Sequence, residues 1–172
     1  MDTVAWQGRW LEVVNRDGWE FVRRRRATGV VGVIAATPAG ELLLVRQHRR
    51  PVGVETIELP AGLVGDEGEM EDPLVAAGRE LEEETGWKAG KLTYLCRAPS
   101  SAGLTSETLQ LVLAEDLVRT GEGGGVPGEE SIVVESIPLE QVAGWLSERI
   151  AAGSLVDAKI WAALWFLGVP RN

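Results

Sequence analysis

Cysteine and histidine are nearly absent from this chain of 172 residues, which contains only Cys96 and His48. A single cysteine excludes an intrachain disulfide, so we expect a reducing compartment such as the cytoplasm. A catalytic thiol is disfavoured because the one histidine lies far away in sequence and Cys96 belongs to an apolar strand. We interpret Cys96 as a packing residue.

The chain also lacks an excess of positive charge and a long apolar run. Its formal net charge of −9 disfavours a general nucleic-acid binder and a protein of anionic membranes. The apolar stretch 160–169 is too short to span a bilayer, and residues 1–10 lack a signal-peptide pattern. The charge does not exclude a small anionic substrate, since a metal ion and a few arginines can reverse the field within one cleft.

The content of 45% hydrophobic and 25% charged residues is typical of one soluble globular domain. Strands before and after a central helix, with further helices at the end, predict an α/β (α+β) sandwich with a mixed sheet. We predict strands at 30–36, 41–46, 56–59, 92–97, 108–114 and 132–137, and closing helices at 139–151 and 157–167.

Residues 4–26 are predicted to form two strands, because Asp17-Gly18 between apolar alternations indicates a hairpin. Trp10, Trp19 and Phe21 are large for such an exposed piece. They are expected to pack against the main body or against a second subunit. The predicted organisation is therefore an N-terminal strand pair at 1–26 and a main domain at 27–172.

The stretch 65–87 contains the central helix. Asp72 followed by Pro73 is typical of a helix start, and Gly86 suits a helix stop, so we predict a helix at about 73–85. Apolar residues recur on this helix at spacings of three and four and should face the core. These residues are Leu74, Ala77 and Leu81.

Three carboxylates of this helix, Glu80, Glu83 and Glu84, fall on one face at i, i+3 and i+4. Like charges repel at that spacing, and a bound divalent cation relieves the repulsion. Oxygen ligands suit a hard ion such as Mg²⁺ or Mn²⁺. Arg79 stands four residues before Glu83 and can hold that carboxylate in place, whereas Glu82 points to the opposite face.

The full pattern is Gly65, five residues, Glu71, seven residues, Arg79-Glu80-Leu81, one residue, Glu83-Glu84, one residue, Gly86 and Trp87. A run of glutamates alone usually means a solvated helix, but these offsets together favour a metal site. The pattern resembles the box of the Nudix hydrolases. This resemblance implies an α/β/α sandwich and assigns the metal ligands to Glu80, Glu84 and the backbone carbonyl of Ala61, with Glu83 holding a further ion or sharing one.

Other segments resemble the ADP-sugar pyrophosphatase branch of that superfamily. They are Arg46-Gln47-His48-Arg49 ahead of Glu58-Leu59-Pro60-Ala61-Gly62, together with Gly8-Arg9-Trp10 and Trp19-Glu20-Phe21-Val22-Arg23-Arg24. The resemblance implies a homodimer that hydrolyses ADP-ribose or a similar nucleotide sugar to a nucleoside monophosphate and a sugar phosphate. Substrate contacts would come from Trp10 and Trp19 on the base, Glu20 at its edge, and Arg24 and Arg49 on the phosphates or ribose. Ordinary hairpin packing is the alternative for the two tryptophans.

The chain departs from that branch at two places. Gly62 lies three residues before the spacing-correct Gly65, so three extra residues are expected to bulge between 62 and 71. Ala102-Gly103 stands where the branch commonly has Pro-Gly, which weakens the specificity for ADP-ribose.

The resemblance also implies a general base on the glycine-rich loop 119–131, where Glu130 matches best and Glu129 is second. Two solvated loop glutamates are the alternative. For the whole chain, two other functions stay open. One is hydrolysis of another nucleotide, such as a nucleoside triphosphate, a flavin dinucleotide or a GDP- or UDP-sugar. The other is a ligand-binding protein without catalysis.

Overall fold

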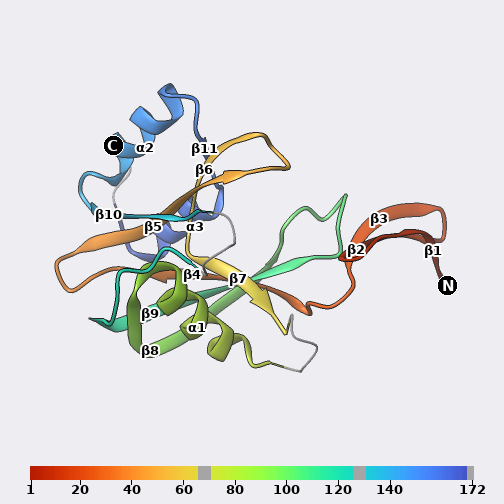
Figure 1. Cartoon of the computed structure of the whole chain (residues 1–172), viewed down its shortest axis with the longest axis horizontal. Coiled ribbons are helices and arrows are strands. Elements are labelled where there is room, and N and C mark those ends of the chain that lie inside the picture. Colours follow the sequence, from red (N-terminus) through yellow and green to blue (C-terminus); the bar gives the residue numbers. More distant parts are fainter. Residues whose placement is uncertain (66–70, 126–130, 170–172) are drawn as a thin grey trace.

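The computed structural model describes residues 1–65, 71–125 and 131–169. Figure 1 shows a body of two four-stranded sheets with helices, from which a three-stranded sheet at the N-terminus projects. The elements are β1 (Asp2–Gln7), β2 (Leu11–Arg16), β3 (Trp19–Arg24), β4 (Gly29–Ala35), β5 (Glu41–Arg49), β6 (Val54–Glu58), β7 (Ala61–Val64), α1 (Pro73–Thr85), β8 (Trp87–Pro99), β9 (Thr108–Arg119), β10 (Val133–Pro138), α2 (Val142–Ala151), β11 (Leu155–Val156) and α3 (Lys159–Phe166).

The N-terminal sheet has the order β1-β2-β3. The predicted hairpin is confirmed, because Asp17 and Gly18 both have positive φ, 53° and 88°, as a tight two-residue turn requires. The prediction of two strands was wrong, since the chain turns once more between β1 and β2. There the Gly8 amide donates to the Leu11 carbonyl at 2.8 Å, and a Cβ on Gly8 would lie 2.5 Å from the Trp6 ring.

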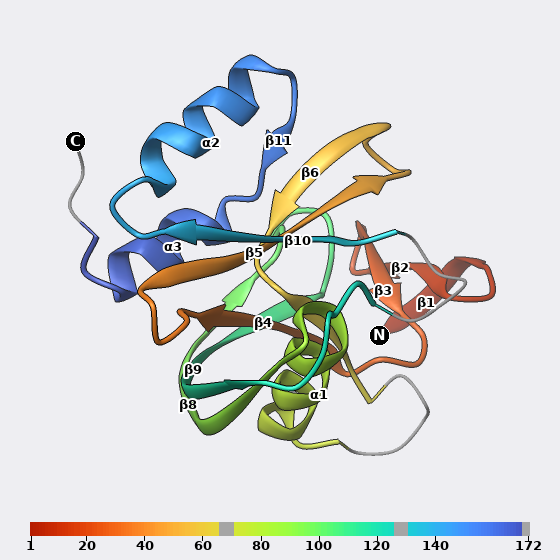
Figure 2. The same ribbon diagram turned by 60° about the vertical axis from the view of Figure 1, so that its left-hand side comes forward.

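The central sheet has the order β7-β4-β9-β8, with β4 parallel to β9 and the other pairs antiparallel. Strand β4 is buried on both faces. Val31 and Val33 pack with α1, whereas Ile34 packs with α3 on the other side. Figure 2 shows α1 on one side of β4 and α3 on the other. The predicted helix-sheet-helix sandwich is therefore present.

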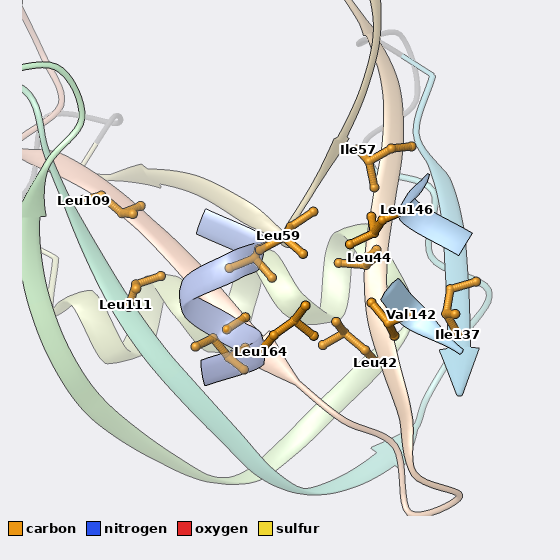
Figure 3. Close-up of a cluster of buried hydrophobic side chains, with 13 residues drawn as sticks. Leu42, Leu44, Ile57, Leu59, Leu109, Leu111, Ile137, Val142, Leu146 and Leu164 are labelled. Carbon is orange, nitrogen blue, oxygen red and sulfur yellow. The ribbon is translucent and has the colours of Figure 1, made fainter. Parts of the chain in front are cut away.

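The second sheet has the order β10-β5-β6-β11 and is also mixed, because β11 runs parallel to β6. Its apolar side chains join α2 and α3 in the larger core cluster (Figure 3). Leu42 and Leu44 of β5 are fully buried there against Leu146 of α2 and Leu164 of α3. Burial of one such leucine contributes about 1.5–3 kcal/mol, so this cluster fixes the second sheet to the body.

Helix α1 spans the predicted residues. The Asp72 side chain accepts a hydrogen bond from the Leu74 amide at 2.8 Å, and Gly86 ends the helix with a φ of 72°. Ala77 and Leu81 are fully buried against the central sheet, as predicted. The helix therefore turns its acidic side away from this core.

Several predicted bounds were too short. Strand β5 continues to Arg49 because its polar end pairs with β6, and the short strands β7 and β11 were not predicted. The tryptophans among the apolar positions of 157–167 are predicted to lie in the core or at a dimer interface. Trp161 and Trp165 of α3 are 49% and 68% exposed, so these two are not core residues. In the described parts of the chain, no helix has the length and apolar character needed to cross a bilayer.

Candidate active site

The last two turns of α1 bring the predicted carboxylates together with the start of β7. Glu84 is only 7% exposed, and its Oε2 accepts a hydrogen bond from the Ala61 amide at 3.0 Å. Glu80 and Glu83 lie beside the Arg79 guanidinium, at 2.8 Å and 3.3 Å. The structure thus groups all four predicted box residues with Ala61.

Glu84 is the most perturbed acid of this group. Burial raises its pKa, and the negative charges of Glu80 and Glu58 raise it further. The Ala61 hydrogen bond and the positive charge of Arg49 act in the opposite direction but are weaker together, so the pKa rises to about 8. Near neutral pH the charged form of Glu84 therefore needs a compensating cation.

Gly62 lies directly against the carboxyl group of Glu80. A Cβ at position 62 would stand 1.9–2.3 Å from the three carboxyl atoms, so any larger residue would force Glu80 to move. The glycine of the Pro-Ala-Gly segment is thus explained by close approach of backbone to carboxylate. It leaves the backbone of β7 in contact with the acidic face of α1.

Arg79 connects the remaining box residues. Its guanidinium contacts Glu71 at 3.4 Å and donates to the Leu63 carbonyl at 3.4 Å. Burial alone would lower the pKa of Arg79, but Glu80 and Glu71 outweigh burial and raise it above its ordinary value. Glu71 in turn accepts from the Gly65 amide at 3.1 Å. The spacing-correct Gly65 and Glu71 therefore meet in space.

The extra residues before the box do not bulge within β7. Strand β7 pairs with β4 in unbroken register, from Gly32 with Ala61 to Gly29 with Val64. The rest of the stretch for which the bulge was predicted includes residues 66–70, which are outside the described part of the chain.

Arg49 lies beside the carboxylate cluster, held by a buried partner. Its guanidinium makes two bonds to Glu58, at 2.8 Å and 2.9 Å, and Glu58 also accepts from the Thr56 hydroxyl at 2.6 Å. Burial opposes the charged form of Glu58, but Arg49 and Thr56 prevail and lower its pKa below the ordinary value. The charge of Arg49 also reaches Glu84.

A pocket of about 350 Å³ lies between the N-terminal sheet and the body. Its lining consists of Trp10, Arg24, Arg26, Ala27 and Leu63. The Arg26 guanidinium lies 5.4 Å from the centroid of the Trp10 ring. Because the Leu63 carbonyl also accepts from Arg79, this pocket adjoins the carboxylate cluster.

Arg24 is already paired within this pocket. Its guanidinium binds Glu107, which also accepts from the Ser100 hydroxyl at 2.9 Å. The same loop bonds the backbone of Val22 through Leu104 and Ser106, at 2.8 Å and 3.0 Å. The loop between β8 and β9 thus attaches β3 to the body.

Trp19 and Glu20 do not reach this pocket. They begin β3, whereas Trp10 precedes β2 at the opposite end of the ladder. The pairs Leu11 with Arg24 and Arg16 with Trp19 are five steps apart, which is roughly 17 Å at about 3.4 Å per residue. Within one chain, the two residues predicted to stack on the nucleobase are therefore far apart.

The predicted general base, Glu130, and its alternative, Glu129, lie outside the described residues.

The donor types of the cluster fit a divalent metal ion. Three carboxylates stand on one face of one helix, and the buried one is disfavoured in its charged form without a cation. Their present arrangement does not enclose an ion, since among the described residues no three acidic, histidine or cysteine side chains form such a group. The positive charge that faces Glu80 and Glu83 is the Arg79 guanidinium, which pairs with both carboxylates.

Comparison with known proteins identifies the family. The NUDIX domain model matches residues 23–155, so the chain belongs to the Nudix family, as predicted. It is 31% identical over 142 residues to the methanol dehydrogenase activator of Bacillus methanolicus, covering 83% of this chain and 73% of that protein. It is 34% identical over 139 residues to the ADP-ribose pyrophosphatase of Bacillus subtilis, covering 81% and 71%.

A solved structure described as an ADP compounds hydrolase has the same fold. It superposes with a TM-score of 0.72 at 23% identity, covering 97% of this chain and 89% of that one. The prediction of a Nudix-type fold is confirmed.

Sequence reasoning did not assign roles to three residues of the site. Glu58 holds Arg49, Glu107 holds Arg24, and Arg26 covers Trp10. The sequence pattern could have indicated Glu58, because this residue is the first of the Glu-x-Pro-Ala-Gly segment. No sequence pattern indicated Glu107, since its partner Arg24 lies 83 residues away in sequence.

Proposed function

We propose that the chain hydrolyses the pyrophosphate bond of ADP-ribose or of a related nucleoside diphosphate sugar, with a divalent metal ion as cofactor. The products would be a nucleoside monophosphate and a sugar phosphate. The observation that carries this proposal is the contact of Arg79 with Leu63, which joins the carboxylate cluster of α1 to the pocket of Trp10 and Arg26. A diphosphate linking a base to a sugar needs both parts of such a site.

Glu80, Glu84 and the carbonyl of Ala61 would hold Mg²⁺ or Mn²⁺, and Glu83 would share it or hold a further ion. Such an ion, when bound, lowers the pKa of a water molecule and offsets charge on phosphate oxygens. Arg79 orients Glu83 and balances the acidic face. Arg24 and Arg49 suit the diphosphate because guanidinium groups bind phosphate oxygens in pairs. Trp10 offers an aromatic face to the base.

A general base must accept the proton of the attacking water. We assign this role to Glu130, on the loop that follows β9. Glu129 is the second candidate, and Glu83 is a further catalytic candidate, because its side chain is 40% exposed and lies within the carboxylate cluster.

The choice of ADP-ribose as substrate is supported by the similarity to the Bacillus subtilis protein, which is named as an ADP-ribose pyrophosphatase.

The first test is a phosphate-release assay of the whole chain, coupled to phosphatase. ADP-ribose is compared with GDP-mannose, UDP-glucose, FAD and dGTP, each with Mg²⁺ and with chelator. We expect the highest kcat/KM with ADP-ribose or another nucleoside diphosphate sugar, and no release with chelator. Preference for dGTP or FAD would reject the substrate class, and activity that survives chelation would reject the metal.

We also propose that the active form is a homodimer in which the base lies between Trp10 of one chain and Trp19 of the other. The separation of these residues along one ladder supports this arrangement, since stacked rings keep their centroids within about 7 Å. Their exposure, 55% and 63%, leaves both indoles available to a second chain.

Co-expression of two variants tests this arrangement. Trp10→Ala and Trp19→Ala are each expected to raise KM for the nucleotide sugar about 5–150-fold, since base stacking contributes about 1–3 kcal/mol. A mixed dimer of the two variants retains one intact site by symmetry, so about a quarter of the wild-type activity should return. If the co-expressed mixture is no more active than either variant alone, the two tryptophans do not share a site.

A further inference from the structure

The glycine-rich loop after β9 bonds to the end of α1. The Gly125 amide donates to the Glu83 carbonyl at 3.1 Å, and the Gly124 amide donates to the Glu84 carbonyl at 2.8 Å. One step further, the Gly86 carbonyl accepts from the amides of Thr120 and Gly121, at 2.8 Å and 3.1 Å. We refer to residues 120–125 as the glycine clasp.

The clasp depends on glycine for steric reasons. A Cβ on Gly123 would lie 2.4 Å from the carbonyl carbon of Thr85 and 2.6 Å from the Glu84 oxygen, both backbone atoms that cannot rotate away. A Cβ on Gly86 would lie 2.3 Å from the Gly121 oxygen. Residues 123–125 also have positive φ, at 73°, 103° and 78°. Two backbones thus pack in direct contact, which no other residue type permits.

The carbonyls that accept these bonds belong to the residues that carry the carboxylates. The last four carbonyls of a helix lack partners within the helix, and the final turn frays when nothing binds them. Glu83 and Glu84 lie in that final turn of α1. A helix C-terminus is also the negative end of the helix dipole, which adds to the repulsion among the carboxylates. Amide donors at this end offset both effects.

We propose that the glycine clasp is a positioning device for the metal site: it holds the last turn of α1 so that the Glu83 and Glu84 carboxylates keep the positions from which they would bind metal. This inference rests on the proposed metal-dependent function. It assigns a role to Gly123 and Gly124, whose own atoms would touch neither metal nor substrate.

The test compares two alanine variants of the same loop. Gly123→Ala meets the backbone of Thr85 and has an unfavourable φ, whereas Gly121→Ala has no heavy atom within 4 Å of its new Cβ and no positive φ. The dissociation constant of Mn²⁺ is measured on each whole chain by electron paramagnetic resonance of the free ion. We expect it to rise about tenfold or more in Gly123→Ala and to stay unchanged in Gly121→Ala.

A variant destabilised elsewhere separates positioning from general stability. Leu146→Ala removes a fully buried side chain of α2, in the core cluster that does not contain α1. It should lower the thermal midpoint without changing Mn²⁺ affinity. If Gly123→Ala does not fold, Gly124→Ala replaces it, because its Cβ has room, 3.8 Å from the Ile132 oxygen, and only the φ of 103° is unfavourable.

Two results would overturn the inference. One is a folded Gly123→Ala or Gly124→Ala variant with wild-type Mn²⁺ affinity; the other is a loss of affinity in Leu146→Ala of the same size. Glu84→Gln serves as the reference for the proposed function. If Glu84→Gln binds Mn²⁺ like the wild type, the assignment of the metal site itself fails. If Glu84→Gln loses affinity while Gly123→Ala or Gly124→Ala binds Mn²⁺ like the wild type, the proposed role of the clasp fails and the metal site stands.

Discussion

Replacing Glu84 by glutamine is expected to lower kcat/KM for the preferred nucleotide sugar by about 10²–10³-fold. Glu84 is the buried member of the carboxylate cluster, and its pKa of about 8 shows how strongly the site disfavours its charge without a cation. Glutamine keeps the size and an oxygen for the Ala61 amide but cannot supply the negative charge. Steady-state phosphate release at saturating Mg²⁺ measures the effect.

Glu82→Gln is the matched control, because Glu82 belongs to the same helix and its side chain is not part of the cluster. We expect its kcat/KM to equal that of the wild type. The metal-free Glu84→Gln protein should be at least as stable in urea as the wild type, since burial already disfavours the charged form. Wild-type activity in Glu84→Gln would remove this residue from the metal site.

Arg49→Ala is expected to destabilise the chain by about 2 kcal/mol at neutral pH. Removing one member of a buried ion pair costs about 3–5 kcal/mol, and we discount this value because the Arg49 side chain is 39% exposed to solvent. The cost arises from Glu58, whose side chain is 10% exposed and would lose both guanidinium bonds. Urea unfolding at pH 7 measures it.

The double variant Arg49→Ala with Glu58→Gln tests that cause. It should regain much of the lost stability, because no buried charge is left without a partner. A double variant as unstable as the sum of its single changes would show that Arg49 acts through other contacts.

The pH dependence of this pair has a definite sign. The folded-state pKa of Glu58 lies below the ordinary value of 4.5, because Arg49 and Thr56 outweigh burial. The unfolded chain therefore binds the proton more readily than the folded chain. The contribution of the pair is complete above pH 4.5 and is lost as the pH falls through the lower folded value. The stability difference between wild type and Glu58→Gln should thus shrink from pH 7 toward pH 3.

The central helix was predictable because its signals are local. Asp72, Pro73 and Gly86 act within one turn of the helix ends, and the spacing of Glu80, Glu83 and Glu84 fixes their common face. The burial of β4 on both faces of the sheet was predictable for a similar reason, since a strand of continuous apolar residues is stable only when both of its faces are packed against other elements.

The other features depend on contacts that no local pattern specifies. The Arg24 pair with Glu107 joins segments that approach only after folding. The separation of Trp10 from Trp19 follows from the ladder register, which the hairpin turn sets but the resemblance did not include. The composition of 119–131 predicted a glycine-rich loop but not its contact with α1, where Gly123 packs against the backbone of Glu84 and Thr85.

The hairpin of β8 and β9 has a further consequence for how related chains can diverge. Strand β8 leaves α1 directly after Gly86 and extends for 13 residues, about 40 Å, to the loop that bonds β3. The N-terminal sheet is held at a second point by the connection 25–28 to β4, where the Thr28 amide donates to the Val64 carbonyl at 2.9 Å. Deleting two residues from each strand of the hairpin would preserve the facing of every side chain but withdraw the loop by about 7 Å, which would break its bonds to Val22. Related chains with a shorter hairpin would therefore hold the N-terminal sheet by the connection 25–28 alone.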